Sequence, residues 1–189
     1  MKRKRSSSRE ENPTPLRNEL VGGITLHVVV ETPKGSRNKY AFDSAKRLFV
    51  LRKVLPEGMK FPQDFGFIPS TRGEDGDPLD VLILLDEPTF PGCVVEARLI
   101  GVLEGEKTIG GEKVVDHRFI AVANESRTHS EIRDIADLND NFLDELERFF
   151  ENYPQEPGHE FKVVARRSAD EALRFIAAAR KHPRVRETA

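Results

Sequence analysis

The chain has 189 residues, of which 30 are Lys or Arg and 32 are Asp or Glu, so its net charge at neutral pH is −2. This length suits one domain, and the near-neutral charge argues against a protein that binds nucleic acid over its whole surface. No run approaches 18 apolar residues, no apolar segment follows the basic start, and a single cysteine excludes an internal disulfide. We therefore expect a cytoplasmic protein without a membrane span.

Residues 1–18 differ from the rest of the chain in charge. They contain six Lys or Arg and two Glu, a net charge of +4, whereas the other 171 residues contain 24 basic and 30 acidic ones, a net charge of −6. Three consecutive serines, two prolines and few apolar side chains predict disorder in this segment. We expect a basic tail at 1–18, one folded domain at 19–183 and a short tail at 184–189.

The segment 24–123 consists mainly of predicted short strands. β-Branched and alternating apolar residues predict strands at 24–31, 39–42, 47–52 and 80–85, and an antiparallel pair at 94–103 and 113–123. Four prolines and four glycines between 55 and 78 predict a long loop of the kind that carries functional residues. Many short strands separated by turn signals favour a small barrel.

The last third of the sequence changes to a helical period. One face of a predicted helix carries Phe142, Leu143, Leu146, Phe149, Phe150 and Tyr153. Pro154 ends this helix, and 161–165 is predicted to be a strand. Ser168 and Glu171 form a capping box that opens a second helix, which ends before Pro183. The predicted fold class is therefore α+β, mainly β, with flanking helices near the C-terminus.

The stretch from 72 to 81 reads RGEDGDPLDV and holds four acidic residues in seven positions. Asp80 adjoins an apolar strand and is drawn toward the core, where neighbouring carboxylates repel one another unless a cation neutralises them. A glycine permits a tight turn and a proline prevents a helix, so Asp75, Asp77 and Asp80 can converge. Carboxylate oxygens in this arrangement favour Mg²⁺ or Mn²⁺.

Two other interpretations of this loop are a calcium-binding EF-hand and a solvated acidic turn. A calcium-binding EF-hand is excluded because, counting from Asp75, the required glycine falls on Asp80 and the twelfth residue is Asp86 rather than Glu. A solvated acidic turn that binds no metal stays open from the loop alone.

The heptapeptide DGDPLDV at 75–81 resembles the signature of the family I soluble inorganic pyrophosphatases. The flanking segments that resemble this family are FPQDFGFIP at 61–69, PG at 91–92 with Val94, GVL at 101–103 and FFENY at 149–153. The similarity runs from about residue 25 to residue 180 and leaves the basic tail outside. The chain is therefore identified as a divergent member of this family.

This resemblance implies a small five-stranded OB-like barrel with helices outside it. It also implies hydrolysis of pyrophosphate to two phosphates, with Mg²⁺, Mn²⁺ or another divalent cation as cofactor. Two metal ions can bridge one water and lower its pKa, and further cations stabilise charge on the leaving phosphate. An oligomer is expected, with a hexamer favoured over a dimer, although Arg148 and Asn152 stand where some hexameric members have contact-forming histidines.

The resemblance also assigns roles to individual residues. The metal-site residues that it implies are Asp75, Asp80, Asp116 and Glu31, and the residue that orients or deprotonates the attacking water is Asp77. The phosphate-binding residues that it implies are Lys39, Arg52, Tyr153 and Arg118. Ordinary surface roles for the two strand cations, a simple strand end at Glu31 and a core role for Tyr153 stay open. His117 is predicted not to be a ligand, and Cys93 is predicted to pack.

Four features depart from the family pattern. Phe65 replaces a usual Tyr, Arg118 replaces a usual Lys, and Pro154 replaces a usual phosphate-binding Lys. The region 104–112 is longer than expected and lacks the usual Asp ligand. The substitutes considered for that ligand are Glu106 and Glu112, or neither, and those for the missing charge are Lys107, Lys113 and Arg72.

These departures keep two alternative functions open. One is a protein of the same fold that binds metal and phosphate ligands with weak or lost turnover. The other is a nucleic-acid-binding module, because OB-like barrels often bind single strands. The acidic body, with no Trp and only two Tyr, argues against the second alternative.

Overall fold

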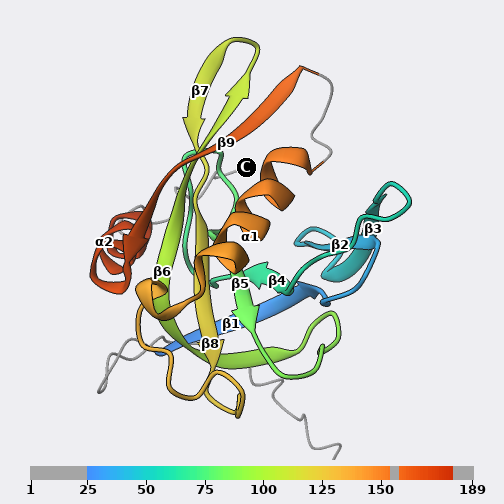
Figure 1. The fold of residues 1–189 in the computed structure, drawn as a ribbon. Coiled ribbons are helices and arrows are strands. Elements are labelled where there is room, and N and C mark those ends of the chain that lie inside the picture. Colours follow the sequence, from blue (N-terminus) through green and yellow to red (C-terminus); the bar gives the residue numbers. More distant parts are fainter. Residues whose placement is uncertain (1–24, 154–157, 181–189) are drawn as a thin grey trace, which may run out of the picture.

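A computed structural model describes residues 25–153 and 158–180 (Figure 1). The predicted tails at 1–18 and 184–189, and also Pro154, lie outside these residues. The strands are β1 (Thr25–Thr32), β2 (Asn38–Asp43), β3 (Leu48–Val54), β4 (Asp64–Phe67), β5 (Asp80–Leu84), β6 (Val94–Ile109), β7 (Glu112–Val115), β8 (Arg118–Ala123) and β9 (His159–Ser168). The helices are the 3₁₀ turn η1 (Ile135–Asp137), α1 (Asp140–Asn152) and α2 (Ala169–Arg180).

Five strands form a closed ring in the order β1, β4, β5, β8 and β6, because β6 pairs with both β8 and β1. Every pairing in this ring is antiparallel except that of β5 with β8, which is parallel. Closing a sheet in this way removes its exposed edges. The prediction of a small five-stranded barrel in an α+β, mainly β fold is confirmed.

β6 is longer than predicted and continues beyond the barrel. The predicted strand at 94–103 extends to Ile109, and two glycines at 110 and 111, with φ of 58° and 91°, turn the chain back into β7. Positive φ at both central residues is the backbone of a two-residue hairpin. β7 and β9 pair with the two edges of this extension, which projects from the barrel (Figure 1).

Two strand predictions between 55 and 123 were wrong in detail. The predicted loop at 55–78 contains β4, a four-residue strand that pairs with β1 and β5. The predicted strand at 113–123 is two strands, β7 and β8, separated at Asp116 and His117. Both differences depend on tertiary pairing rather than on local preference, because short strands are specified largely by their neighbours.

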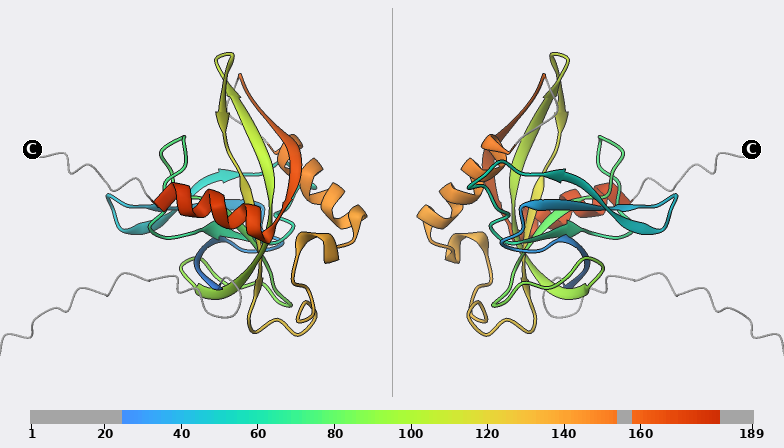
Figure 2. Two further views of the ribbon diagram at one scale, coloured as in Figure 1. Left: turned by 90° about the vertical axis from the view of Figure 1, so that its left-hand side faces the viewer. Right: turned by 90° about the vertical axis from the view of Figure 1, so that its right-hand side faces the viewer.

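β5 and β8 are buried on both faces, as strands covered on two sides must be. Their alternate residues divide between two core clusters, one that includes α2 and one that includes α1. The helix residues in these clusters are Ala172 and Ile176 of α2, and Leu143, Leu146 and Phe150 of α1. The helices lie on different sides of β6 (Figures 1 and 2). Neither described helix is long and apolar enough to cross a membrane.

β2 and β3 form a separate two-stranded sheet beside the end of β1 (Figure 1). Two side chains at the end of β1 hold it there: Glu31 accepts from the backbone N–H of Phe42 at 2.7 Å, and Thr32 Oγ1 accepts from that of Tyr40 at 3.0 Å. Cys93, which was predicted to pack, is partly buried against the cluster that includes α2.

Candidate active site

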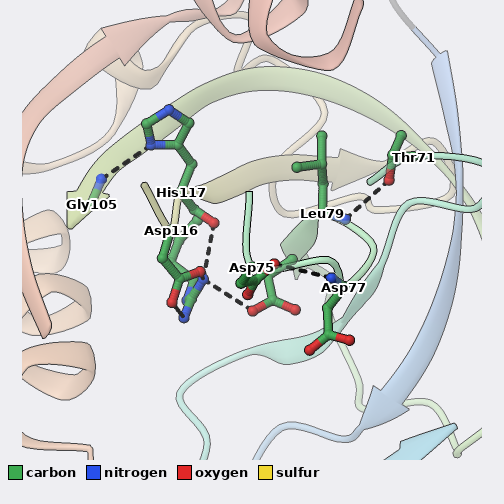
Figure 3. A network of polar contacts seen from close by, with 9 residues as sticks. Thr71, Asp75, Asp77, Leu79, Gly105, Asp116 and His117 are labelled. Carbon is green, nitrogen blue, oxygen red and sulfur yellow. Dashed lines mark hydrogen bonds and ion pairs between the residues drawn. The ribbon is translucent and has the colours of Figure 1, made fainter. Parts of the chain in front are cut away.

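The loop that carries Asp75 and Asp77 is closed by hydrogen bonds at its base. Thr71 Oγ1 donates to the carbonyl of Ile68 at 2.6 Å. It also accepts from the backbone N–H of Leu79 at 3.0 Å (Figure 3). At the loop tip, the backbone N–H of Asp77 donates to Asp75 Oδ1 at 3.1 Å. These bonds hold both aspartates in one compact turn directly before β5.

Asp80 and Arg118 lie side by side because they open two paired parallel strands, β5 and β8. Arg118 Nη1 is 3.0 Å from Asp80 Oδ2. Arg118 Nη2 donates to Asp116 Oδ2 at 2.8 Å, and Nη1 also contacts Asp116 Oδ1, so the guanidinium engages both oxygens of that carboxylate. The structure therefore brings two predicted metal ligands together around a buried cation.

Gly105 in β6 fixes the position of Asp116. The backbone N–H of Asp116 donates to the Gly105 carbonyl at 2.9 Å, and the Gly105 N–H donates to His117 Nδ1 at 3.3 Å (Figure 3). A Cβ at position 105 would lie 2.5 Å from both the Asp116 carbonyl oxygen and the Phe161 ring, so only glycine permits this approach. His117 also packs on Phe175, with ring centroids 4.5 Å apart, and burial lowers its pKa.

The carboxylates of this group disfavour one another's charge. Burial raises the pKa of Asp80 to about 6, with Arg118 and Lys39 opposing the shift and Asp116 adding to it. Burial also raises the pKa of Asp75, and the neighbouring Asp116 charge again adds to the effect. One buried arginine therefore does not offset the negative charge, and the group favours additional cations.

Glu31 lies at the edge of the same group. The residue is only 9% exposed, and its carboxylate accepts from the backbone N–H of Phe42. Burial raises the pKa of Glu31 to about 7, and the Asp80 carboxylate contributes in the same direction while Lys39 opposes it. The predicted assignment of Glu31 to the surroundings of the aspartates is thus consistent with its position.

Tyr153, at the C-terminal end of α1, faces two lysines. The ammonium groups of Lys39 and Lys53 lie 5.4 Å and 5.2 Å from the centroid of its ring, within the range of cation–π attraction. The Tyr153 hydroxyl is buried without a hydrogen-bond partner among the described residues, and burial raises its pKa to about 12. A protonated donor beside two ammonium groups is suited to binding an anion.

Lys53, rather than Arg52, is the β3 cation that the structure places at Tyr153. Lys53 pairs directly with Lys39 across the hairpin, whereas Arg52 is exposed and falls where the register of the two strands shifts. Strict alternation along 47–52 cannot reveal such a bulge. Phe65, the residue that replaces a usual Tyr, has its ring centroid 5.6 Å from the Lys39 ammonium.

The substitutes considered for the missing ligand are placed in the β6–β7 hairpin. Glu106 Oε2 lies 2.6 Å from Lys113 Nζ, so the possible substitute ligand and the possible substitute cation pair with each other. Glu112 is exposed at the hairpin end. Glu74 instead accepts from the backbone N–H of Val115 at 3.3 Å, which brings a fourth loop acid next to the turn before β8. The sequence gives Glu74 no role, although it belongs to the acidic run.

A cavity of about 500 Å³ opens onto the aspartates between the loop, the turn from β7 to β8, and α2. Asp75, Asp80 and Asp116 line it, together with Arg72, and α2 contributes Phe175 and two alanines. Carboxylate oxygens are suitable donors for a hard divalent cation. As the described residues stand, however, no three Asp, Glu, His or Cys side chains are arranged to hold a metal ion, and Arg118 engages the oxygens of two of the aspartates.

Comparisons with known proteins match this architecture. The family model for inorganic pyrophosphatase matches residues 28–184. An inorganic pyrophosphatase of Synechocystis is 37% identical over 151 residues, which are 80% of this chain and 87% of that protein. The crystal structure of the Thermus thermophilus inorganic pyrophosphatase superposes with a TM-score of 0.80 at 38% identity, covering 88% of this chain and 95% of that one. The structure of the Helicobacter pylori inorganic pyrophosphatase superposes with a TM-score of 0.79 at 34% identity, covering 90% of this chain and 98% of that one.

The matches span nearly all of the described barrel and both helices. They include the loop at 75–80, whose sequence resembles the signature of this family. The chain therefore belongs to the family I soluble inorganic pyrophosphatases.

Proposed function

We propose that this chain hydrolyses inorganic pyrophosphate to two phosphates. The observation that carries this proposal is the convergence of Asp75, Asp80 and Asp116 on one cavity, in a barrel of the pyrophosphatase family. A group of acids that favours cations, and a separate pair of lysines, suit a reaction on a polyanion. The acids would hold the metal ions and the lysines the phosphates.

Members of this family use divalent metal ions, and we propose Mg²⁺ for this chain. The donors are hard oxygens, which Mg²⁺ and Mn²⁺ prefer over softer metals. Asp75, Asp80 and Asp116 would hold the ions directly, and Glu31 would support them from the end of β1. When bound, such ions activate water as a nucleophile and neutralise phosphate oxygens.

Asp77 is the proposed general base. It is exposed at the tip of the loop, and its backbone N–H is tied to Asp75, so it stands beside the metal-binding group without being buried in it. An exposed carboxylate there can accept the proton of the attacking water when that proton is released. Its position follows from the compact turn rather than from a contact with a basic residue.

Lys39, Lys53 and Tyr153 are the proposed phosphate-binding residues. The two ammonium groups lie on directly paired strands and within 5.4 Å and 5.2 Å of the Tyr153 ring centroid, so an anion at Tyr153 would lie near two positive charges. The Tyr153 hydroxyl is available as a donor to the same anion. Arg52, which the sequence predicted for this role, stays a prediction, and Arg118 would add positive charge from beneath the aspartates.

The domain and assembly assignments also remain proposals. We propose that residues 19–183 form one domain, and that the chain assembles into an oligomer, with a hexamer favoured over a dimer. On the exposed side of α1, Asn152 Nδ2 donates to the Arg148 carbonyl at 2.7 Å, and these two residues stand where some hexameric members of the family have contact-forming histidines.

The test is phosphate release from pyrophosphate with Mg²⁺, Mn²⁺ or Zn²⁺ as the sole divalent cation. Wild type is compared with Asp77→Ala and with Glu125→Ala, which removes another exposed loop acid. Loss of release only in Asp77→Ala supports the assignment of the base. If wild type and Asp77→Ala release phosphate equally slowly with every metal while wild type still binds Mg²⁺ and phosphate, the protein is a ligand binder without turnover.

A further inference from the structure

We propose that Arg118 is an internal cation that competes with divalent metal ions for Asp80 and Asp116, and that it thereby sets the metal affinity of the site. This inference rests on the proposed function, because the metal ions concerned are those of the pyrophosphatase site.

The competition follows from the atoms that Arg118 engages. Its Nη1 lies 3.0 Å from Asp80 Oδ2, and its two terminal nitrogens contact both oxygens of Asp116. A metal ion that binds these carboxylates needs lone pairs on the same oxygens. It would also stand close to the guanidinium charge, and two cations at one carboxylate repel each other strongly when water is excluded. Metal binding must therefore weaken or displace the arginine contacts.

Arg118 is held in place from the other direction as well. Its guanidinium carbon lies 4.9 Å from the ring centroid of Phe161 and 5.4 Å from that of Phe150. The residue is only 7% exposed, and His117 adds a backbone carbonyl 3.0 Å from Nη1. These contacts hold the guanidinium against the aspartates and keep it out of solvent. A metal ion that binds the aspartates must therefore compete with it.

The arginine is nevertheless incompletely bound. Its Nε is buried and has no hydrogen-bond partner among the described residues, so only two of its three nitrogens are used. The cavity of about 500 Å³ reaches Asp80 and Asp116 without Arg118 among its lining residues. A metal ion can therefore approach the carboxylates from a side that the arginine does not cover.

The geometry of the side chain predicts how to shift this competition. A guanidinium presents a planar fork that matches a carboxylate through two bonds, whereas the lysine ammonium is a single point charge. Arg118→Lys keeps the charge and releases one Asp116 oxygen. Mg²⁺ is then expected to bind about tenfold more tightly, a factor that corresponds to the loss of one charge-assisted hydrogen bond.

The experiment is calorimetric titration of Mg²⁺ into metal-stripped protein in the absence of pyrophosphate. The matched control is Arg166→Lys, because Arg166 also contacts three acids but lies between β9 and α1, outside the site. We expect a roughly tenfold lower dissociation constant in Arg118→Lys and less than a twofold change in the control. Equal tightening in both variants would overturn the proposal, since the effect would then not depend on the contacts of Arg118 with Asp80 and Asp116.

A second variant keeps the proposal testable if Arg118→Lys does not fold, which thermal unfolding in EDTA reports. Phe161→Leu removes one ring from the guanidinium without touching the aspartates, and it is expected to tighten Mg²⁺ binding about threefold. Unchanged or weaker Mg²⁺ binding in the folded variants overturns the inference. If wild type releases phosphate with Mg²⁺, that result leaves the proposed function standing; if wild type neither binds Mg²⁺ nor releases phosphate, both fall.

Discussion

Two arginines in this protein each contact several carboxylates, and the comparison separates a structural group from a functional one. Arg166 on β9 lies 3.0 Å from Asp140 and 2.6 Å from Glu147, and it also contacts Asp144. The three acids follow one face of α1, so this arginine ties the helix to the sheet. Its side chain is 29% exposed, and surface ion pairs of this type stabilise proteins only slightly.

Arg118 is itself buried and contacts two partly buried acids that come from different segments. Asp80 opens β5 and Asp116 lies in the turn before β8, and the Arg118 side chain is only 9% exposed. Burial and mutual repulsion raise the pKa of Asp80, which means that the acids are held where their charge is unfavourable. The burial of Arg118 and the raised pKa of Asp80, more than the number of ion pairs, therefore mark the group that needs further cations.

The largest expected difference between the two groups is catalytic. Asp80→Asn removes a charged metal ligand and is expected to lower pyrophosphate hydrolysis by at least about a thousandfold, because metal activation supplies several kcal/mol of barrier lowering. Asp144→Asn in the Arg166 group is expected to change the rate less than about twofold. Steady-state phosphate release measures both. Comparable losses in the two variants would contradict the assignment of the site.

The second difference is in the free energy of unfolding. Arg118→Met removes a buried cation from two partly buried carboxylates and is expected to cost about 3 kcal/mol in metal-free protein. Arg166→Met is expected to cost about 1 kcal/mol or less, because two of its three partners, Asp140 and Asp144, are 91% and 44% exposed. Urea unfolding in EDTA measures both values. Equal costs would show that burial does not distinguish the two groups.

The third difference is in the pH dependence of stability. Glu31, beside the buried group, has its pKa raised by burial from its ordinary value of 4.5 to about 7. Between these values the folded state keeps a proton that the unfolded chain has lost, so stability falls as the pH rises, by roughly 2–3 kcal/mol over the interval. Glu31→Gln is expected to reduce this slope in metal-free urea titrations at pH 4.5 to 7.5, whereas Glu147→Gln keeps it. If Glu31→Gln leaves the slope unchanged, the pH dependence arises from a group other than Glu31.

The smallest expected effect compares two neighbouring cations on β3. Lys53→Ala removes an ammonium group beside Tyr153 and is expected to lower kcat/KM for pyrophosphate about 10- to 50-fold, as loss of one charged contact to phosphate would. Arg52→Ala removes an exposed charge, and less than a twofold change is expected. The reverse ranking would restore the sequence-based assignment of Arg52.

Much of the barrel could be predicted because its strands carry local signals. The apolar runs of β5 and β8 and the β-branched run of β1 identify themselves, and the helical period of α1 is regular. β4 could not be found in this way, since a four-residue strand between prolines and glycines is specified by the strands on either side. The division between β7 and β8 depends on Gly105, whose missing Cβ lets Asp116 approach β6.

The site was predictable where it lies within one loop and less so where distant segments meet. Asp75, Asp77 and Asp80 are close in sequence, and their grouping follows from a tight turn. The contact between Asp80 and Arg118 depends on the parallel register of two strands, which no local pattern records. Lys53 pairs with Lys39 because the β2–β3 register shifts by one residue, whereas the family resemblance implied its neighbour Arg52.

The pairing of β1 with β6 also has a kinetic consequence. It joins residues such as Val29 and Val94, or Thr25 and Arg98, which are between 65 and 73 positions apart in the chain. Closing this long loop lowers the conformational entropy of the chain before the β1–β6 contacts form and stabilise it. Folding is slower in proteins in which such long-range contacts dominate. On a ribosome, β1 must therefore wait for β6 to emerge before the barrel can close.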